Sequence, residues 1–548
     1  MDTSGASDTR HVADALAEIL GGKDPFFSMV DHVDPHFAAV QVLKPFSYAL
    51  DQPVREDDNW LFFDGALFNG GMEGRSEGTQ AATSSLIRLL GEIRSRDLSG
   101  LRSLNGQFNA VAGFPGPKRM VVVTDRLGSR PLYYGSSGTK QIVASEIKAV
   151  VAALDRPFPL SQQGVLELFA FGHNVGDRTV LKGIRVLPPG SVIEIDERGI
   201  RSSPYFQYRY RAEPYLKDPA ALGERITSAV REAVPAYFRA RGRKGFFLSG
   251  GLDSRIIAGA VEEEFIPLNA FTFGYPESRD VVYAANLSKR LGFTHHVFTY
   301  PEIYLSKVIR DVVARTECAA PFYHATSLLF HERIHAEADA IVVGFCGDVF
   351  SGGHLRPAMF KLPPGPEITG LIFDRALCTR RQELARIFHP HVMEHVWMQM
   401  VDSFRSGVDK IEGQSGVDVA DVWDVENRQR RFTFSAPKVD RRRFEVLAPL
   451  LDNRFVDLVL TLPAWARRGQ LAYRHAIFNG YPALQGVPCA ATGKPLQLNP
   501  LWGGVQEMMR LGNRAASMVL ARFGLRTDSL GWRFRDIGEE MRRDRVLF

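Results

Sequence analysis

With 548 residues, the chain is long enough to form two or more domains, each with its own hydrophobic core. Hydrophobic residues make up 45% of it and charged residues 24%, the balance of an ordinary globular protein, and a net charge of +5 gives no reason to expect a nucleic acid partner. No apolar run reaches the roughly 18 residues of a membrane span, and the polar segment 1–10 has no signal-peptide core. The scattered cysteines form no CxxC pair, so neither a zinc site nor a disulfide framework is expected. These features predict a cytoplasmic protein.

Short apolar segments with the alternation of β-strands fill the first 210 residues. Turns rich in glycine, proline and aspartate separate them, and two stretches have the apolar spacing of helices. This pattern predicts packed sheets with flanking helices, which is an α+β domain. The strand-like segments are 60–63, 108–112, 120–123 and 191–195, and the helix-like ones are 82–94 and 163–171.

A segment rich in tyrosine, arginine and proline at 205–218 predicts a linker, so we divide the chain into the domains 1–210 and 211–548. After the linker, helical patterns alternate with apolar strands, which implies a doubly wound α/β domain with helices on both faces of a parallel sheet. Ligands of such sheets bind beyond the carboxyl ends of the strands. The expected strands are 245–248, 268–273, 296–299 and 340–344, and the expected helices are 220–239, 255–263 and 280–291.

The string FFLSGGLDS at 246–254 joins the first of these strands to a helix. Gly250 and Gly251 let the backbone approach an anion closely, and the following helix directs its N–H groups at the same point. Asp253 adds a carboxylate of the kind that Mg²⁺ prefers. A lone Gly-Gly turn is more often a simple strand–helix connection, but the complete string predicts a phosphate site. The residues expected to bind the nucleotide here are Leu248, Ser249, Gly250, Gly251, Asp253 and Ser254.

The string SGGLDS resembles the pyrophosphate-binding loop of ATP pyrophosphatases, in the form used by glutamine-dependent asparagine synthetases. Segments 104–108, 124–134 and 178–190 resemble the glutaminase half of the same family. The resemblance implies an Ntn-hydrolase-like sandwich followed by an ATP-pyrophosphatase-type domain. It also implies that ATP and Mg²⁺ are used to adenylate a carboxylate, after which an amine displaces AMP and an amide forms.

A second glycine-rich loop, GFCGDVFSGG at 344–353, follows another predicted strand. In the family, a loop with an aspartate at this place completes the Mg²⁺–pyrophosphate site, which makes Asp348 the expected second metal ligand beside Asp253. Gly347 is expected to contact the nucleotide. Phe273, at the end of the second strand, is expected to flank the adenine.

Two departures from the family affect the glutaminase half. Its chemistry depends on an N-terminal cysteine whose thiolate attacks glutamine, but position 2 is Asp2 and the first cysteine is Cys318. Where the family has Asn-Gly as an oxyanion-hole pair, this chain has Asp64-Gly65, and a carboxylate repels the developing oxyanion. We therefore expect no glutaminase activity, as in the related β-lactam synthetases and lasso-peptide macrolactam synthetases, which use an amine already present on the substrate.

Two lysines are candidates for the family's late catalytic lysine, which contacts the phosphates and the developing charge. Lys494 lies 42 residues after Asp452 (494 − 452), close to the family spacing, and Lys438 is the alternative. A single lysine is more often a solvated surface charge. Arg255 stands where many relatives have a second serine, and residues 504–525 have the apolar spacing of a helix.

The sequence also does not decide which residue acts as the base that deprotonates the attacking amine. Phe345 stands where β-lactam synthetases have the tyrosine of their base dyad, which counts against that reaction. The remaining candidates are Tyr323, His324 and His354, each of which is more often a packing or surface residue.

The expected function is ATP-dependent amide formation through an acyl-adenylate, with macrolactam closure of a peptide as the first hypothesis. A β-lactam-type or other small-molecule amide ligase is the second, and a non-catalytic nucleotide-binding homologue is the alternative of another class. The expected partners are a carboxylate and amine substrate, together with a precursor peptide and its processing protease. The sequence leaves the oligomeric state open.

Overall fold

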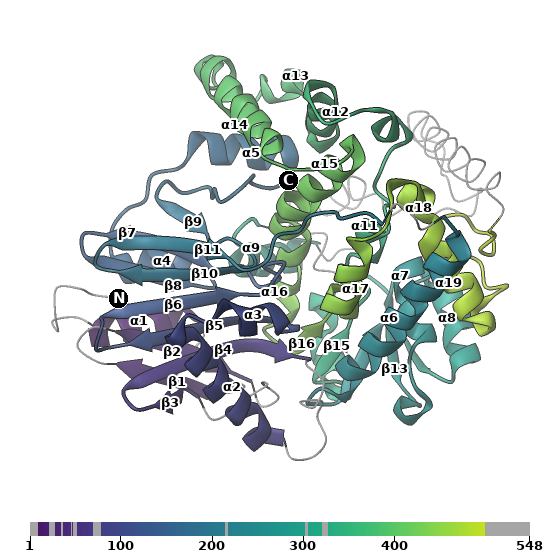
Figure 1. The fold of residues 1–548 in the computed structure, drawn as a ribbon, viewed down its shortest axis with the longest axis horizontal. Helices are drawn as coiled ribbons and strands as arrows, with labels where there is room; N and C mark the ends of the chain where they lie inside the picture. The colour runs from purple at the N-terminus through teal and green to yellow at the C-terminus, as the bar shows by residue number, and fades with distance from the viewer. Residues whose placement is uncertain are drawn as a thin grey trace.

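A computed structural model describes residues 9–20, 28–33, 37–44, 47, 52–68, 78–213, 217–301, 305–319 and 327–498 (Figure 1). The helix predicted at 504–525 lies outside this range, as do Asp2, Tyr323 and His324. Among the described residues, no helix is both long and apolar enough to cross a membrane.

A six-stranded antiparallel sheet in the order β11-β10-β6-β5-β4-β3 is the main element of the N-terminal half. Successive side chains of a strand face opposite sides, so β4 contributes Leu61 and Phe63 to one core and Trp60 and Phe62 to another. The strands are β3 (Val54–Glu56), β4 (Asn59–Leu67), β5 (Gly106–Phe114), β6 (Arg119–Thr124), β10 (Ser191–Asp196) and β11 (Gly199–Pro204).

Helices cover this sheet on one side and two smaller sheets cover it on the other. Helices α2 (Gly78–Ser95) and α3 (Leu98–Ser103) pack on the Leu61 side. The Trp60 side packs against a second layer, which α1 and α4 cover from outside. That second layer consists of the hairpin β1 (Ser28–Val33) and β2 (Ala38–Leu43) and the sheet β8-β7-β9 (Lys140–Ala144, Tyr133–Ser137 and Ile184–Val186). The covering helices are α1 (Thr9–Leu20) and α4 (Ile147–Leu154).

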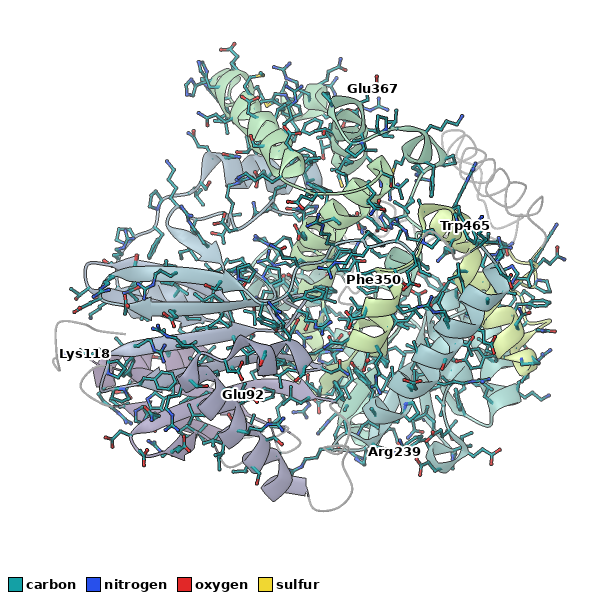
Figure 2. All side chains as sticks on the ribbon, in the orientation of Figure 1. Glu92, Lys118, Arg239, Phe350, Glu367 and Trp465 are labelled. Carbon is teal, nitrogen blue, oxygen red and sulfur yellow. The ribbon has the colours of Figure 1, made fainter. Side chains whose placement is uncertain are left out.

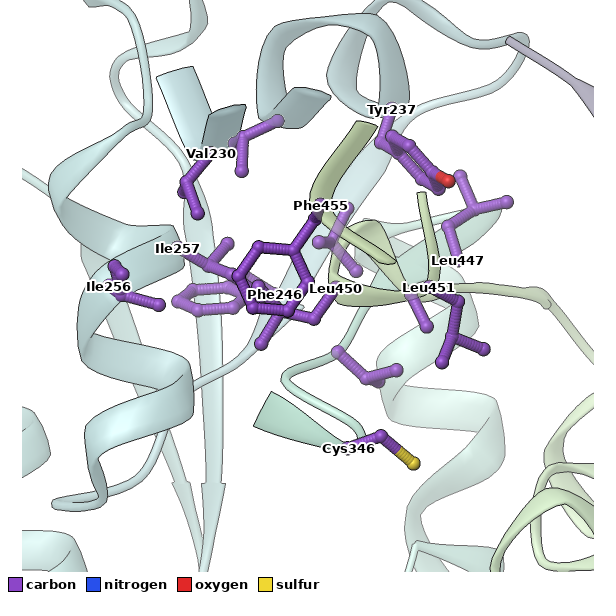
Figure 3. Close-up of a cluster of buried hydrophobic side chains, with 14 of the residues drawn as sticks. Val230, Tyr237, Phe246, Ile256, Ile257, Cys346, Leu447, Leu450, Leu451 and Phe455 are labelled. Carbon is purple, nitrogen blue, oxygen red and sulfur yellow. The ribbon is translucent and has the colours of Figure 1, made fainter. Parts of the chain in front are cut away.

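A five-stranded parallel sheet in the order β14-β13-β12-β15-β16 organises the C-terminal half. Its apolar strand residues pack against helices; Figure 3 shows Phe246 of β12 beside Ile257 of α7 and Val230 of α6. The strands are β12 (Lys244–Phe247), β13 (Asn269–Phe273), β14 (Thr294–Phe298), β15 (Ala340–Val342) and β16 (Glu445–Leu447). The helices include α6 (Pro219–Arg239), α7 (Leu252–Gly259), α8 (Arg279–Leu291), α9 (Leu305–Thr316), α10 (His331–Glu337), α17 (Asn453–Val459) and α19 (Leu471–Gly480).

Between β15 and β16 the chain forms a helical subdomain with its own apolar core. Helix α5 (Gln162–Phe171) of the N-terminal half completes this core, since Leu166 and Phe171 pack with Trp397 and Phe404. The helices of the segment are α11 (Gly347–Phe350), α12 (Pro366–Ala376), α13 (Arg381–Leu384), α14 (Trp397–Asp409), α15 (Gly416–Trp423) and α16 (Pro437–Asp440), with π-helical turns at Val392–Val396 and Asp424–Gln429. After α17 comes α18 (Ala464–Arg467).

The two halves meet over a continuous, largely buried contact. Figure 2 labels Phe350 near the middle of the molecule, and Tyr208 stacks on its ring with the centroids 5.9 Å apart. Glu445 of β16 contacts Arg130 and Lys44 of the N-terminal half. The Asn105 side chain also donates to Asp452 at 2.8 Å.

The architecture confirms the fold class expected from the sequence, a sandwich of antiparallel sheets followed by a doubly wound parallel-sheet domain. The helix predicted at 255–263 is wrong at both ends, because α7 begins at Leu252 and ends at Gly259. Leu252 packs against the core, which extends the helix backward, whereas Glu263 and Glu264 are exposed and offer no apolar face to continue it. The domain boundary near residue 210 stays a prediction.

Candidate active site

The order of the parallel strands places two glycine-rich loops side by side. The chain leaves β12 toward β13 on one side and reaches β15 on the other, so the ligand crevice expected for such a sheet lies beyond the carboxyl ends of β12 and β15. The turn 249–254 follows β12, and the loop 344–348 follows β15. Both loops predicted to hold the nucleotide therefore lie at one switch point of the sheet.

Two serine side chains brace the turn after β12. The hydroxyl oxygens of Ser249 and Ser254 lie 3.0 Å apart, and the Ser254 hydroxyl accepts from the Ser249 N–H at 3.2 Å. The Gly251 N–H donates to the Ser249 hydroxyl at 3.2 Å, and the Gly250 N–H donates to Asp280 at 3.0 Å. Leu248 is buried at the end of the strand, so its contribution to a ligand site is limited to its backbone. The turn is thus held in shape by its own chain.

Asp253 and Asp348 lie together at the mouth of this crevice. Asp253 Oδ2 accepts the Asp348 backbone N–H at 2.8 Å, and its Oδ1 accepts the Tyr473 hydroxyl at 3.2 Å. Gly347 makes the approach possible, because a Cβ at that position would lie 2.6 Å from the Asp253 carboxyl carbon. The structure therefore brings Asp253, Asp348 and Gly347 into direct contact.

The pKa values of both carboxyl groups are raised above their ordinary values. Burial raises the pKa of Asp253 well above its ordinary value, and the neighbouring Asp348 charge adds to this. Asp348 is open to solvent on one side, yet partial burial raises its pKa too, while the nearby His354 acts in the opposite direction. A bound cation would stabilise the charged forms of two carboxylates that lie so close together.

The carboxylates of Asp253 and Asp348 suit Mg²⁺ better than a metal ion whose ligands must all come from protein side chains. Mg²⁺ takes one or two carboxylates and fills its other positions with water and substrate phosphate oxygens. In the part of the chain that the structure describes, no group of three or more metal-binding side chains occurs. Asp253 and Asp348 would hold the ion, which would neutralise the negative charge that collects on the phosphate oxygens.

A short turn that carries Lys494 docks directly on the phosphate loop. The Ala490 N–H donates to the Gly250 carbonyl at 2.9 Å, and the Cys489 N–H donates to the Lys494 carbonyl at 2.9 Å. A Cβ on Gly250 would lie 2.9 Å from the Ala490 Cβ, so the glycine is needed for this contact. Lys494 itself is exposed at the edge of the crevice.

Arg255 has a structural role that the sequence did not predict. Its side chain is only 1% exposed, and its two terminal nitrogens donate to the carbonyls of Val487 and Pro488, each at 2.7 Å. These carbonyls begin the turn that carries Lys494. Arg255 thus connects the helix α7, which follows the turn 249–254, to the turn that carries Lys494. The one indication of this role in the sequence was that Arg255 stands where many relatives have a serine.

Lys438 lies elsewhere. Its ammonium group donates to the Tyr133 hydroxyl at 3.1 Å and to the Ser145 carbonyl at 3.0 Å, and it stands 4.5 Å from the centre of the Tyr133 ring. Both partners belong to the N-terminal half. The structure therefore does not bring Lys438 together with Asp253 and Asp348.

Phe273 belongs to an aromatic cluster at the ends of the outer strands. Its ring stacks on Phe298 with the centroids 5.6 Å apart and packs edge-on to Phe247 at 5.1 Å. Phe273 is half-buried, and its ring also packs against Phe330 with the centroids 5.9 Å apart. The adjacent His295 and His296 bond to different partners, Thr272 and Asn269, as expected for neighbours on opposite faces of a strand.

A buried polar network stands behind Asp348 and was missed in the sequence. Arg467 is fully buried and pairs with Asp418 and, at 2.6 Å, with Asp421, which also accepts the Tyr210 hydroxyl at 2.6 Å. His354 lies 3.1 Å from Asp421. Burial lowers the pKa of His354, but the carboxylates of Asp424 and Asp421 outweigh this and raise it overall. The partners come from segments far apart in the sequence, so no local pattern indicates them.

Two family models match different parts of the chain. A family model for asparagine synthase matches residues 225–472, and a model for the glutamine amidotransferase domain matches residues 46–206. The first match contains both glycine-rich loops, and the second contains Asp64.

Relatives of known name are distant. Amidase chyE of Penicillium rubens is 26% identical over 61% of this chain and 54% of its own length. Asparagine synthetase [glutamine-hydrolyzing] 3 of Bacillus subtilis is 25% identical over 66% of this chain and 62% of its own length. The chain thus spans less than two thirds of either relative. A solved glutamine phosphoribosylpyrophosphate amidotransferase from B. subtilis aligns over 54% of this chain and 64% of its own, with 14% identity and a TM-score of 0.26.

Proposed function

Since the chain belongs to the asparagine synthetase superfamily, we propose that it is an ATP-dependent carbon–nitrogen ligase that forms AMP and pyrophosphate. The observation that carries this proposal is the contact between Asp253 and Asp348 at the ends of neighbouring parallel strands, beside a braced phosphate loop. Family resemblance alone gives the reaction class. The paired aspartates add a reason to expect that this chain still performs it, because two crowded carboxylates are costly without a cation.

In the proposed reaction the chain's own groups position ATP and the substrate. The turn 249–254 binds the pyrophosphate part of ATP, Gly347 lines the same crevice, and Phe273 borders the adenine. A carboxylate oxygen of the substrate attacks the α-phosphorus, and pyrophosphate leaves. An amine then attacks the acyl carbon, loses a proton, and displaces AMP. Lys494 is the cation placed to balance charge during these steps.

The amine comes with the substrate in this proposal. Asp64 pairs with Arg130 through two contacts of 3.0 and 3.1 Å, so a carboxylate held by a guanidinium stands where the family has an oxyanion-hole asparagine. Such a carboxylate opposes the charge of the tetrahedral intermediate of glutamine hydrolysis. Release of ammonia from glutamine by the purified protein would overturn this part of the proposal.

The finer proposal is closure of a macrolactam ring on a modified peptide, supplied by a precursor peptide and its processing protease. Phe345 argues against the β-lactam reaction, since a phenylalanine cannot relay the proton of the attacking amine. His354 is a poor candidate for the base of the same step, because its side chain is only 7% exposed and its Nε2 lies 3.1 Å from Asp421. A small-molecule amide ligase remains the second hypothesis.

The test is ATP–pyrophosphate exchange with a panel of carboxylates and peptides. We expect exchange that depends on one substrate, yields AMP, and falls about a hundredfold or more in Asp348→Ala, because a metal ligand contributes several kcal/mol. Asp374→Asn, an exposed aspartate on α12, is the matched control and should match the wild type. ADP as the product would contradict the ligase proposal. ATP binding without any exchange would favour the non-catalytic homologue.

A further inference from the structure

A cleft of about 880 Å³ lies between the N-terminal half and the helical segment between β15 and β16. One wall is the chain 423–430, a second is α14, and a third consists of loops of the N-terminal half that include Pro189 and Phe206. Asp253, Asp348 and Lys494 are absent from its lining, so this cleft is separate from the ATP crevice.

Two of the cations in the lining already pair with carboxylates outside it. Arg126 pairs with Asp457 at 2.7 Å, and Arg178 pairs with Glu167 at 2.7 Å. Lys410 at the end of α14 is exposed, so water solvates its charge. These three cations therefore leave the acidic side chains of the lining without an ion pair.

Glu426 is the acidic side chain in the wall 423–430, and it has no contact partner. Glu426 and Arg430 stand four positions apart, a spacing at which such side chains often pair on a helix. Here the Arg430 guanidinium, which is only 7% exposed, instead donates to the Leu187 carbonyl of the N-terminal half at 2.5 Å. Within the described part of the chain, no hydrogen bond or ion pair reaches the Glu426 carboxylate. The Arg430 charge attracts it only from a distance.

The environment of Glu426 favours a cationic ligand. Burial raises the pKa of Glu426, although the Arg430 charge acts in the opposite direction. A half-buried carboxylate that has lost water without gaining a donor is costly, and a cation in the cleft would offset this cost. Asp402 of α14 adds a second carboxylate to the same lining.

The uncharged part of the lining suits peptide groups. Four polar side chains in it make no hydrogen bond within the part of the chain that the structure describes, and they can donate to or accept from a peptide main chain. These side chains are Gln207, Gln399, Ser403 and Ser406. The volume equals about 29 water molecules at about 30 Å³ each, which is more than one amine-bearing side chain would fill.

We propose that this cleft binds a segment of a peptide that carries a lysine or arginine side chain. That side chain pairs with Glu426 and Asp402, a main-chain carbonyl accepts from Arg430, and the polar side chains of the lining bond to further peptide groups. The inference rests on the proposed function for the presence of a peptide substrate, whose reacting end lies in the ATP crevice. The two proposals fail separately: exchange without binding of basic peptides would refute this inference alone, and peptide binding without exchange would refute the ligase proposal alone.

The first test measures the fluorescence polarisation of labelled hexapeptide pools with the unmodified protein. The third residue of each pool is fixed as lysine, arginine, norleucine or glutamate, the other positions are mixtures of uncharged residues, and both ends are blocked. We expect the lysine and arginine pools to bind at least about tenfold more tightly than the norleucine pool, which keeps a hydrocarbon stem but lacks the charge.

Three results would overturn the inference. One is equal affinity of all four pools, or no binding by any pool at about 1 mM. The second is tightest binding by the glutamate pool. The third is displacement of the lysine pool by less spermidine than unlabelled peptide, which would assign the cleft to a free amine.

The second test locates the site with a variant that removes the charge. Glu426→Gln keeps the shape of the side chain and should weaken binding of the lysine pool at least about tenfold, which removes its advantage over the norleucine pool. Glu394→Gln is the matched control, because Glu394 is an exposed glutamate of the same helical segment and lies outside the lining. Unchanged affinity in folded Glu426→Gln would contradict the assignment.

A third test fills the cleft. Gly407 of α14 lines it, and a Cβ at this position meets nothing within 4 Å, so Gly407→Trp can fold and should weaken peptide binding at least about tenfold. Gly370→Trp is the matched control, because this position of α12 is equally open but lies outside the lining. Circular dichroism verifies folding of each variant. Equal peptide affinity in the two tryptophan variants would place the peptide elsewhere and refute the inference.

Discussion

At the scale of single residues, Arg255 shows how a departure from a family pattern can be structural and still affect the proposed reaction. It contacts no position where ATP is expected, yet it fixes the two carbonyls at the start of the Lys494 turn. We therefore regard it as a positioning residue. Its buried guanidinium has lost water, and the two carbonyls replace that lost hydration.

Replacement of Arg255 should separate nucleotide binding from turnover. In Arg255→Met we expect the Kd for ATP to change by less than about threefold, while pyrophosphate exchange falls about tenfold or more as the Lys494 turn loosens. Nucleotide titration and exchange kinetics measure the two effects. Arg239→Met is the control, since Arg239 pairs with Glu262 and Glu264 at the surface. Equal losses of ATP affinity and exchange in Arg255→Met would point to general unfolding of the crevice.

Asp253 links the site to stability through its raised pKa. Because folding raises this pKa, the folded state favours the protonated form; the stabilisation is present below the unfolded pKa and is lost as pH rises through the folded one. Asp253→Asn should therefore stabilise the protein at pH 8 by about 1 kcal/mol, with little effect at pH 4. Thermal unfolding at the two pH values measures this. Mg²⁺ with ATP should raise the Tm of the wild type more than that of the variant, and an equal rise in both would contradict a metal role for Asp253.

At the scale of elements, the crevice depends on how closely the loops after β12 and β15 approach. Gly347→Ala would place a methyl group 2.6 Å from the Asp253 carboxyl carbon, and the loops would have to separate. We expect about tenfold or greater loss of pyrophosphate exchange. Gly370→Ala is the matched control, because a Cβ at that position of α12 meets nothing within 4 Å. This control should keep full exchange activity and gain up to about 1 kcal/mol of stability from helix propensity.

Local patterns were enough to predict most of the elements but not all of their contacts. The period of two in β4 and the apolar run of β12 predicted both sheets, because each pattern records which face is buried. The Asp253–Asp348 contact was expected from the family resemblance and from the place of both residues after parallel strands. The Arg467 network and the Arg255 clamp join segments distant in the sequence, and their buried charges have no periodicity. The predicted start of α7 was wrong because the contact of Leu252 with the core is set by tertiary packing.

At the scale of the whole molecule, Glu445 holds the halves together by electrostatics. Arg130 and Lys44 lower its pKa below the ordinary value despite its burial, so its contribution to stability is present above the unfolded pKa and lost as pH falls through the folded one. Glu445→Gln removes the carboxylate that Arg130 and Lys44 share and should destabilise the protein by about 3 kcal/mol at pH 7. Chemical denaturation at several pH values measures this, and the difference from the wild type should shrink in acid. A difference that grows in acid would contradict the ion-pair account.

Helix α5 of the N-terminal half packs into the core of the helical segment between β15 and β16, so the two halves depend on each other. Leu166 and Phe171 fill a core whose other side chains come from the helical segment between β15 and β16, so neither part would bury its apolar side chains completely without the other. Removal of the N-terminal half would therefore expose apolar side chains of this helical segment to solvent. Whatever reaction the protein performs, its first 210 residues are needed to complete the fold of the rest.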